Sequence, residues 1–310
     1  MTTAEPVPAP PHQPGRAILQ GLLDFRRSLA AERAPAAVPD AVAQGLAVAK
    51  VYAFASADYP GAAESAIFDS DGTTAVGGFI FDPASTTSPA TAFTFSGGAY
   101  QILTVPTSTV SIATGINGHR LIVGVYQDLA NARHGFADNR GTFTNVDFPG
   151  ATSTQAIGVN DAGHIVGDYF DAANVEHGFV SSGGTFTAIN FPGATGTAAA
   201  DINAAGDIVG VFSDATGSHG FRFQAGAFTP INFPLAKSTT CFGISDAGEI
   251  AGSYTDAAGN THGFIFAGGA FSTVDVAGAR TTQLTRIKNG GLVTGACFDA
   301  VNGQHGLIGQ

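Results

Sequence analysis

The sequence predicts an all-β chain, a six-bladed β-propeller built from four-stranded repeats of about 43 residues. Three observations predict this fold. The tripeptide His-Gly-Phe returns at a nearly constant spacing, short runs rich in β-branched and aromatic residues alternate with turn residues, and 42 of the 310 residues are glycine. That glycine share is about twice the average, as expected for a chain with many tight turns.

The spacing of the tripeptide is the strongest of these signals. It occurs at His134, His177, His219 and His262, and returns as His-Gly-Leu at His305, with intervals of 43, 42, 43 and 43 residues. A second marker, an aromatic residue followed by Pro-Gly, ends at Pro60-Gly61, Pro149-Gly150 and Pro192-Gly193. A period near 43 is the length of one four-stranded propeller blade.

One copy, residues 154–195, shows the expected strands. The runs TQAIGVN, HIVGDYF, HGFVS and TFTAINF are separated by NDAG, DAANVE and SGG, and PGAT leads to the next copy. Each run has the length and composition of a β-strand, and each separator carries turn residues. We name the four strands A to D, from the centre of the propeller outward.

The number of A strands predicts how the ring closes. They are expected near residues 64–68, 111–116, 154–159, 197–202, 239–244 and 282–287. The last copy ends after its C strand, whereas residues 51–59 have the D pattern and precede the first A strand. We therefore expect 51–59 to be the outer strand of the last blade, which closes residues 51–310 into one domain without open edges.

The first fifty residues have a different composition. Residues 1–14 are rich in Pro and Ala and are expected to be a disordered tail. Apolar residues at helical spacing predict an amphipathic helix over 15–34, within a helix-and-linker segment 15–50: Ile18, Leu22, Phe25 and Leu29. This helix docks either on its own propeller or on a partner. No basic stretch followed by an apolar one is present, so the sequence as given predicts a cytoplasmic protein.

Charge and composition exclude several function classes. The chain has 13 Lys and Arg against 24 Asp and Glu, a net charge of −11. Nucleic acids and anionic membranes require clustered cations, so neither is an expected partner. Two cysteines are too few for a disulfide scaffold or a cysteine-based zinc site. No run approaches the roughly 18 apolar residues of a membrane span, and no cofactor or metal is expected.

The repeat resembles the HAF-repeat family, found mostly in bacterial extracellular proteins. The markers that carry the resemblance are the IVGxYxD strand, the DxxGxxHGF hairpin and the GxFTxxxxPG strand, which read here, for example, as HIVGDYFDAANVEHGF. The resemblance covers roughly residues 51–310. It implies an extracellular location and says almost nothing about activity.

The repeated histidines are expected to be structural. His134, His177, His219, His262 and His305 lie on C strands of different blades, too far apart to bind one metal ion. An aspartate precedes each by five or six residues, so the two side chains can meet across the B–C hairpin. The stretch 69–72, DSDG, lacks the other ligands of a calcium loop and aligns with the A–B turn. Cys241 and Cys297 fall at core positions and are expected to be buried thiols, with a disulfide as the alternative.

Departures from the repeat are the candidate functional residues. One position on strand A is glycine in three copies, Gly115, Gly158 and Gly243, but is Asp201 and Arg286 in two others and Ile67 in the first. The two charges either pair across a narrow channel or anchor a ligand there. Lys237 and Arg280 stand in two D–A turns, in a domain with only eight Lys and Arg.

Three functions remain open from the sequence. The first is a non-catalytic binding module that recognises a small polar or acidic ligand, a glycan or a protein at the channel mouth. The second is an enzyme, a lyase, cyclase or hydrolase, with Asp201 as acid or base and Arg286, Lys237 and Arg280 as anchors. The third is a structural repeat protein without a ligand. A raised Asp201 pKa in a deep pocket favours the enzyme, and an Asp201–Arg286 pair in a plugged channel counts against it.

Overall fold

The computed structural model describes residues 52–80, 89–299 and 303–310, and this part of the chain consists of strands and turns without a helix. The all-β prediction is therefore confirmed. The predicted tail 1–14, the predicted helix 15–34 and the linker to residue 50 lie outside the described residues.

Four sheets have four strands each, in sequence order. The first contains β6 (Ser108–Ile116), β7 (Leu121–Asp128), β8 (Arg133–Asn139) and β9 (Thr142–Val146). The second contains β10 (Ser153–Val159), β11 (Ile165–Phe170), β12 (Glu176–Ser182) and β13 (Thr185–Ile189). The third contains β14 (Gly196–Ile202), β15 (Ile208–Asp214), β16 (Gly217–Gln224) and β17 (Ala227–Ile231). The fourth contains β18 (Ser238–Ile244), β19 (Ile250–Thr255), β20 (Thr261–Ala267) and β21 (Ala270–Val274).

The remaining strands form one eight-stranded sheet with two halves. One half contains β22 (Thr281–Ile287), β23 (Val293–Phe298), β24 (Gln304–Gly309) and β1 (Phe54–Ser56). The other contains β2 (Glu64–Ser70), β3 (Thr74–Ile80), β4 (Thr91–Ser96) and β5 (Ala99–Ile102). A single residue pair, Glu64 with Gln304, joins the halves through β2 and β24.

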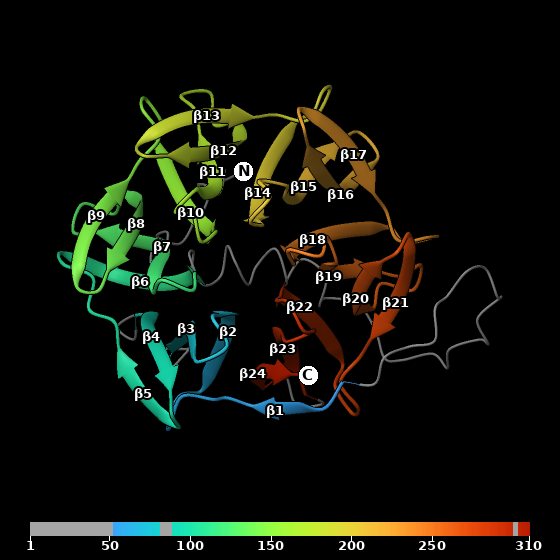
Figure 1. Ribbon diagram of the computed structural model, residues 1–310, viewed down its shortest axis with the longest axis horizontal. Helices are drawn as coiled ribbons and strands as arrows, with labels where there is room; N and C mark the ends of the chain where they lie inside the picture. The colour runs from blue at the N-terminus through green and yellow to red at the C-terminus, as the bar shows by residue number, and fades with distance from the viewer. Residues whose placement is uncertain (1–51, 81–88, 300–302) are drawn as a thin grey trace, which may run out of the picture.

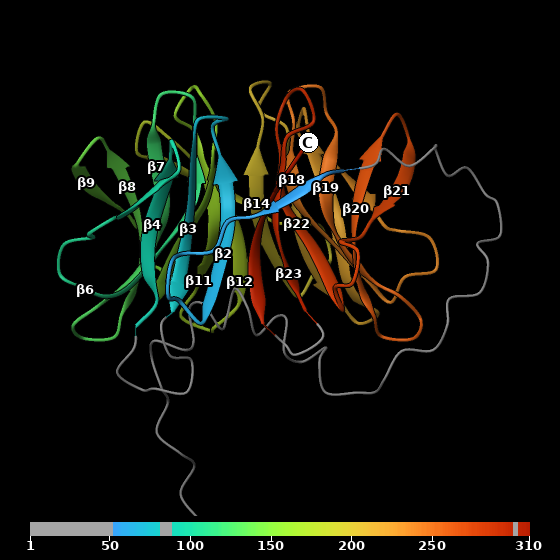
Figure 2. The same ribbon diagram turned by 90° about the horizontal axis from the view of Figure 1, so that it is seen from below.

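The sheets stand in a ring, and the first strand of each copy lies nearest the centre (Figure 1). The strands run along the axis of this ring, so their turns gather at two ends (Figure 2). We call the end with the turns between first and second strands the A–B end. The opposite end, with the turns between second and third strands and the connections between copies, is the B–C end.

The His-Gly-Phe tripeptide has three separate roles in the packing. Its Phe is fully buried in successive sheets, as for Phe136 and Phe179. Its Gly is required because a Cβ at Gly135 would lie 2.5 Å from the carbonyl oxygen of Val146, on the next strand. Its His lies on the outer part of the sheet at the B–C end. One short motif therefore fixes the third strand of each copy.

The aromatic residue before Pro-Gly packs one copy against the next. Phe148 follows β9 and stacks on Tyr169 of the next sheet, with ring centroids 3.7 Å apart, and Phe191 stacks on Phe212 at 3.6 Å. Since such aromatic pairs bury large apolar area, they hold neighbouring sheets in register.

The N-terminal strand joins the C-terminal one. β1 pairs antiparallel with β24, from Phe54 opposite Gly309 to Ser56 opposite Leu307, so the outer strand expected from 51–59 is present but only three residues long. Just after it, Asp58 accepts a hydrogen bond from the Gly306 N–H at 3.0 Å and lies 2.9 Å from His305 Nδ1. These contacts connect the two ends of the described chain. Among the described residues, no helix is long and apolar enough to cross a membrane.

Candidate functional site

Each innermost strand contains a β-bulge near the centre of the ring, and one residue follows each bulge. These residues are Asp69, Gly115, Gly158, Asp201, Gly243 and Arg286. The register corrects the sequence alignment, because Asp69 and not Ile67 pairs with the valine of the second strand. Asp69 and Ser70 also belong to β2, so only the second half of the 69–72 stretch is in the A–B turn.

Glycine stands at three of these positions because the strands approach one another closely. A Cβ at Gly243 would lie 2.6 Å from the Cα of Arg286, and one at Gly158 would lie 2.9 Å from the Cα of Asp201. A glycine in one copy thus makes room for the charged residue in the next.

The guanidinium of Arg286 fills the centre of the ring. Its Nη1 and Nη2 atoms donate to five backbone carbonyls at 2.8–3.3 Å, those of Thr114, Ile157, Ala200, Phe242 and Thr285. Its Nε lies 3.7 Å from a carboxylate oxygen of Asp69 and 3.7 Å from one of Asp201. Arg286 is only 3% exposed, so it closes the central channel at this level and contacts the first strand of every copy.

The two aspartates beside Arg286 are also held by backbone groups. Asp69 accepts from the Ile116 N–H and Asp201 from the Ile244 N–H, both at 3.0 Å. Burial raises the pKa of Asp201, and the attraction of Arg286 and Lys288 offsets only part of that effect. Burial alone would lower the pKa of Lys288, but Asp69 and Asp201 outweigh it and raise that pKa. The Lys288 ammonium lies 2.9 Å from Asp69.

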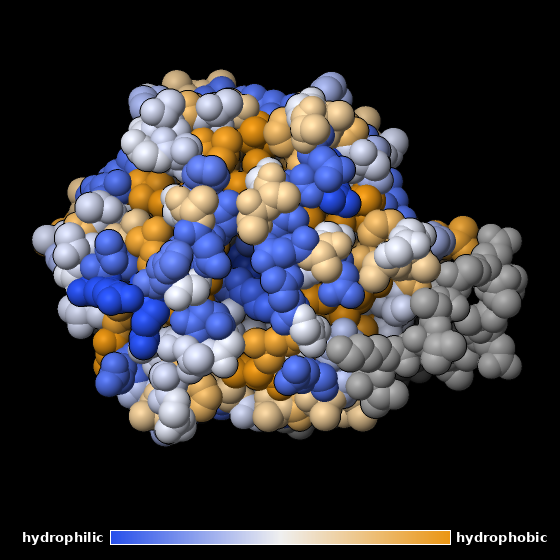
Figure 3. All heavy atoms as spheres, in the orientation of Figure 1, coloured by the Kyte–Doolittle hydropathy of each residue, from blue (hydrophilic) through white to orange (hydrophobic). Residues whose placement is uncertain are grey.

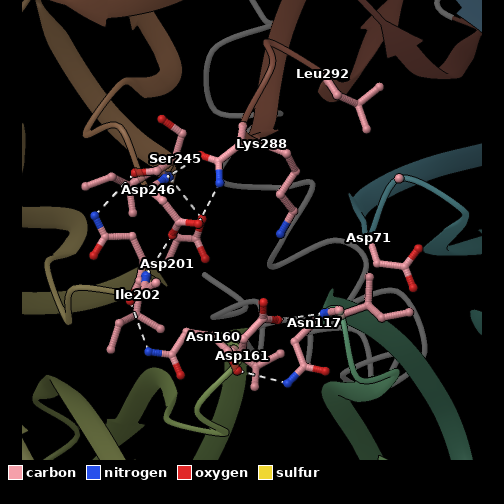
Figure 4. A pocket seen from close by; sticks show the side chains of 18 residues that line it. Asp71, Asn117, Asn160, Asp161, Asp201, Ile202, Ser245, Asp246, Lys288 and Leu292 are labelled. Carbon is pink, nitrogen blue, oxygen red and sulfur yellow. Dashed lines mark hydrogen bonds between the residues drawn. The ribbon is translucent and has the colours of Figure 1, made fainter.

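A polar cup with a volume of about 270 Å³ opens above Arg286 at the A–B end. Figure 3 shows this end from outside, with hydrophilic residues gathered around a hollow at its centre. Asp201 and Lys288 line the cup, together with the A–B turns of all copies. In Figure 4 the Lys288 side chain extends from the turn after β22 toward the middle of the cup.

A chain of asparagines forms part of the wall. Asn117 donates to the Asn160 carbonyl at 2.9 Å, Asn160 to that of Asn203 at 3.0 Å, and Asn203 to that of Ser245 at 3.2 Å. Each side chain therefore ties its own A–B turn to the next one (Figure 4). Lys288 occupies the corresponding position in the last copy, where its ammonium pairs with Asp69 instead.

The rim of the cup is negatively charged. Asp161 accepts from the Gly118 N–H at 2.7 Å through one oxygen. Asp246 accepts from the Ala204 N–H at 2.8 Å and from Asn289 Nδ2 at 2.6 Å. With Asp71, these exposed or partly exposed carboxylates outnumber the single ammonium of Lys288, which Asp69 already neutralises. The cup therefore suits a hydroxylated ligand with a positive charge better than an anion.

The four predicted site residues fall into two groups. Asp201 and Arg286 meet at the centre, at 3.7 Å, directly below the cup. Lys237 and Arg280 are exposed and lie just before β18 and β22, at the B–C end. A strand of six or seven residues spans about 20 Å, so the structure does not bring Lys237 and Arg280 to the cup. Sequence reasoning missed Lys288, although it is the one cation at a repeat position that otherwise holds Asn117, Asn160, Asn203 and Ser245.

All five repeated histidines contact the expected aspartate across the B–C hairpin. The Nε2–carboxylate distances are 3.5, 3.2, 3.3, 3.5 and 3.4 Å for His134, His177, His219, His262 and His305. Each Nδ1 also lies 2.8–3.3 Å from an Asp or Asn at the end of the outer strand, which the sequence did not indicate: Asp147, Asn190, Asn232, Asp275 and Asp58. Hydrogen bonds to Asp275 and Asp58 raise the pKa of His262 and His305.

Within the described ranges, metal ligands and reactive cysteines are the other groups to consider. There, no three His, Cys, Asp or Glu side chains are grouped so that they could hold a metal ion. Cys241 and Cys297 are free and buried, and burial raises the pKa of both thiols, which disfavours the reactive thiolate.

Comparison with known proteins identifies the fold but no family. No protein-family model matches the chain, and no curated protein matches its sequence. Among solved structures, it is similar to TolB from Acinetobacter baumannii, with 10% identity, a TM-score of 0.56 and coverage of 77% of this chain and 64% of that one. It is also similar to the β-propeller domain of the Trilobed protease from Pyrococcus furiosus, with 8% identity, a TM-score of 0.51 and coverage of 80% and 94%.

The chain has a β-propeller fold. A third similar structure, AofleA from Arthrobotrys oligospora, has 14% identity and a TM-score of 0.52 and covers 83% of this chain and 86% of that one. This chain thus spans slightly less than two thirds of TolB but most of the other two. Identities this low bear on the fold alone, so function has to be argued from the site.

Proposed function

We propose that this propeller is a non-catalytic binding module whose cup at the A–B end takes a small, hydroxylated, positively charged ligand such as an amino sugar. The observation that carries the proposal is the cup itself, with carboxylates on its rim, amides in its wall and the Lys288 ammonium reaching toward its middle. An ammonium group of the ligand would pair with Asp161 or Asp246, and its hydroxyls would bond to Lys288 and the amide groups.

The same proposal includes the finer architecture. Dividing the eight-stranded sheet at the Glu64–Gln304 contact gives six blades of four strands, with β1 as the outer strand of the last. Residues 51–310 then form one domain of the HAF-repeat type. Arg286 lies below the cup and is a structural hub, because all its hydrogen bonds go to backbone carbonyls.

Calorimetric titration of the full chain with glucosamine and with glucose tests the cup. We expect glucosamine to bind and the double variant D161N/D246N to bind it at least about tenfold more weakly, because both carboxylates that can pair with the ammonium become neutral. Asparagine is compatible with the local backbone, since Asn289 occupies the same repeat position.

The repeat supplies a matched control. The double variant D147N/D275N also removes two carboxylates, but at the B–C end, where Asn190 and Asn232 already stand at the equivalent positions. It should bind glucosamine as the wild type does. Equal loss in both double variants, or no binding of glucosamine by the wild type, would overturn the proposal. The second of these results would favour a structural repeat protein.

An enzyme remains a second candidate because burial raises the pKa of Asp201, a residue that lines the cup. One oxygen of Asp201 accepts from the Ile244 N–H and the other faces Arg286, so neither is free to exchange a proton without rearrangement. Turnover of a panel of glycosides that D201N abolishes, while the variant stays folded, would establish catalysis. Absence of turnover in the wild type would leave the binding module.

A further inference from the structure

A second cavity, of about 290 Å³, lies at the B–C end between the sheet β6–β9 and the sheet β10–β13. Arg133 and Asn131 line one side of it, and Thr152, Phe170 and Asn174 line the other. It is separated from the cup by the length of the strands. We call it the interblade groove.

Arg133 is the residue that suggests a ligand. It is half buried, and its guanidinium makes no hydrogen bond or ion pair within the described part of the chain. Of the described charged groups, Asp168 is the one that attracts Arg133; it is 4% exposed and accepts from Gln155 Nε2 at 2.9 Å. Burial, and then the nearby Glu176, raise the pKa of Asp168 well above its usual range, so this carboxyl is a weak counter-charge. The five N–H donors of Arg133 are therefore available.

The two asparagines of the groove are held in position by identical turns. Asp128 accepts from the N–H groups of Ala130 and Ala132 at 2.8 Å, which sets Asn131 at a φ of 67°. Asp171 shapes the next turn in the same way, and Asn174 has a φ of 60°. Asp128 and Asp171 pair with His134 and His177, and neither forms an ion pair with Arg133. The groove is thus preorganised, which lowers the entropic cost of binding.

The other copies show that the groove is a departure from the repeat. The position of Arg133 is Glu176, Ser218, Thr261 and Gln304 in the copies that follow. Among the described copies, only this one has an arginine at that position. Since the sheet folds with Glu, Ser, Thr or Gln there, packing alone does not require the arginine.

We propose that the interblade groove binds a sugar acid, with the carboxylate on Arg133 and the sugar hydroxyls on the Asn131 and Asn174 amides. The planar guanidinium matches a carboxylate through two parallel hydrogen bonds. The Asn131 and Asn174 amides, one on each side of the groove, can donate to or accept from the hydroxyls of the sugar. The volume, near the lower limit for ligand pockets, admits about one monosaccharide residue.

Titration of the full chain with glucuronate, and with glucose as the uncharged control, tests this proposal. We expect glucuronate to bind the wild type, and R133Q to bind it at least about tenfold more weakly. The control variant R140Q removes an exposed arginine from the opposite end of the same sheet and should leave the affinity unchanged. Equal loss in R133Q and R140Q, or no binding of glucuronate to the wild type, would overturn the proposal.

A second variant guards against a folding defect in R133Q. N131G/N174G keeps the left-handed backbone that both positions require and removes only the two amides, so it should fold and bind glucuronate several-fold more weakly. Unchanged affinity in N131G/N174G together with unchanged affinity in R133Q would exclude the groove. D161N/D246N should bind glucuronate normally, so failure of the cup and failure of the groove are distinguishable.

Discussion

The B–C end and the centre of the molecule use the same repeat in opposite ways. At the B–C end, each copy makes its own His–acid contacts with nearly the same residues and distances. At the centre, equivalent positions hold Asp, Gly or Arg, and their side chains and backbones meet in one cluster around Arg286. Each consensus histidine contacts residues of its own sheet, whereas the ring axis is where residues of all copies come within reach.

The largest expected effect on stability comes from removing the Arg286 guanidinium at the centre of the ring. R286M should lower the free energy of unfolding by about 3–5 kcal/mol, because it leaves Asp201 buried without its nearest cation, Asp69 with Lys288 alone, and five carbonyls without the guanidinium donor. Chemical denaturation measures this change in the free energy of unfolding. R280M removes an exposed arginine one residue before the same strand and should cost about 0.5 kcal/mol or less. Similar losses in the two variants would contradict the role of Arg286 as a hub.

The next effect concerns the buried acid Asp168. Its pKa is raised in the folded state, so the folded protein binds more protons than the unfolded one, and stability falls as pH rises from the ordinary pKa of Asp through the raised one. The loss is about 1.4 kcal/mol for each pH unit between the two values. D168N should remove that part of the pH dependence and be more stable than the wild type at neutral pH. Melting temperatures from pH 4 to 8 test it, and a parallel loss in both proteins would contradict it.

A smaller effect is expected at the contact between the chain ends. D58A removes the partner of His305 and the acceptor of the Gly306 N–H, so it should cost about 1–2 kcal/mol at pH 6. Asp58 raises the pKa of His305, so the stability that the protonated histidine adds is present at low pH and is lost as pH rises through that raised pKa. The difference between wild type and D58A should therefore shrink from pH 6 to pH 8.5. A constant difference would show that the charge of His305 plays no part.

The smallest effect is expected for one consensus histidine. H177N should cost no more than about 1 kcal/mol, because its two partners are partly exposed and the other copies are unaffected. Hydrogen exchange should show faster opening confined to β11–β13. Opening that spreads to other sheets would mean that the consensus contacts are not local, and the contrast with Arg286 would fail.

The repeat made most of the fold predictable. The period and the turn residues recur along the chain, and they were enough to predict the innermost strands. The missing outer strand of the last copy predicted that residues near 54 pair with the C-terminus. The sequence alignment of the copies is wrong in the first copy, where it predicts Ile67 instead of Asp69 at the position after the bulge. The regular spacing fails there, because Asp69 precedes Gly115 by 46 residues, whereas the later equivalent positions are 42 or 43 residues apart.

The candidate site was less predictable. Asp201 and Arg286 stood out as charges on an inner strand, and they do meet. The cup lies at the end where the A–B turns converge, and the sequence does not show this convergence. Lys237 and Arg280 instead predicted a ligand site at the opposite, B–C end. Arg133 and Phe170 are 37 residues apart and belong to different copies. Only the structure, which places their two sheets side by side, shows that both line the interblade groove.

Hydrogen exchange of the full chain with and without glucosamine tests the central claim, that the meeting point of the copies at the A–B end is the binding site. The account predicts slower exchange at the A–B turns, including the His164 N–H bonded to Asn160 and the Glu249 N–H bonded to Ser245, with no change at the B–C turns. Protection at the B–C turns near Lys237 and Arg280, with none at the A–B end, would contradict it.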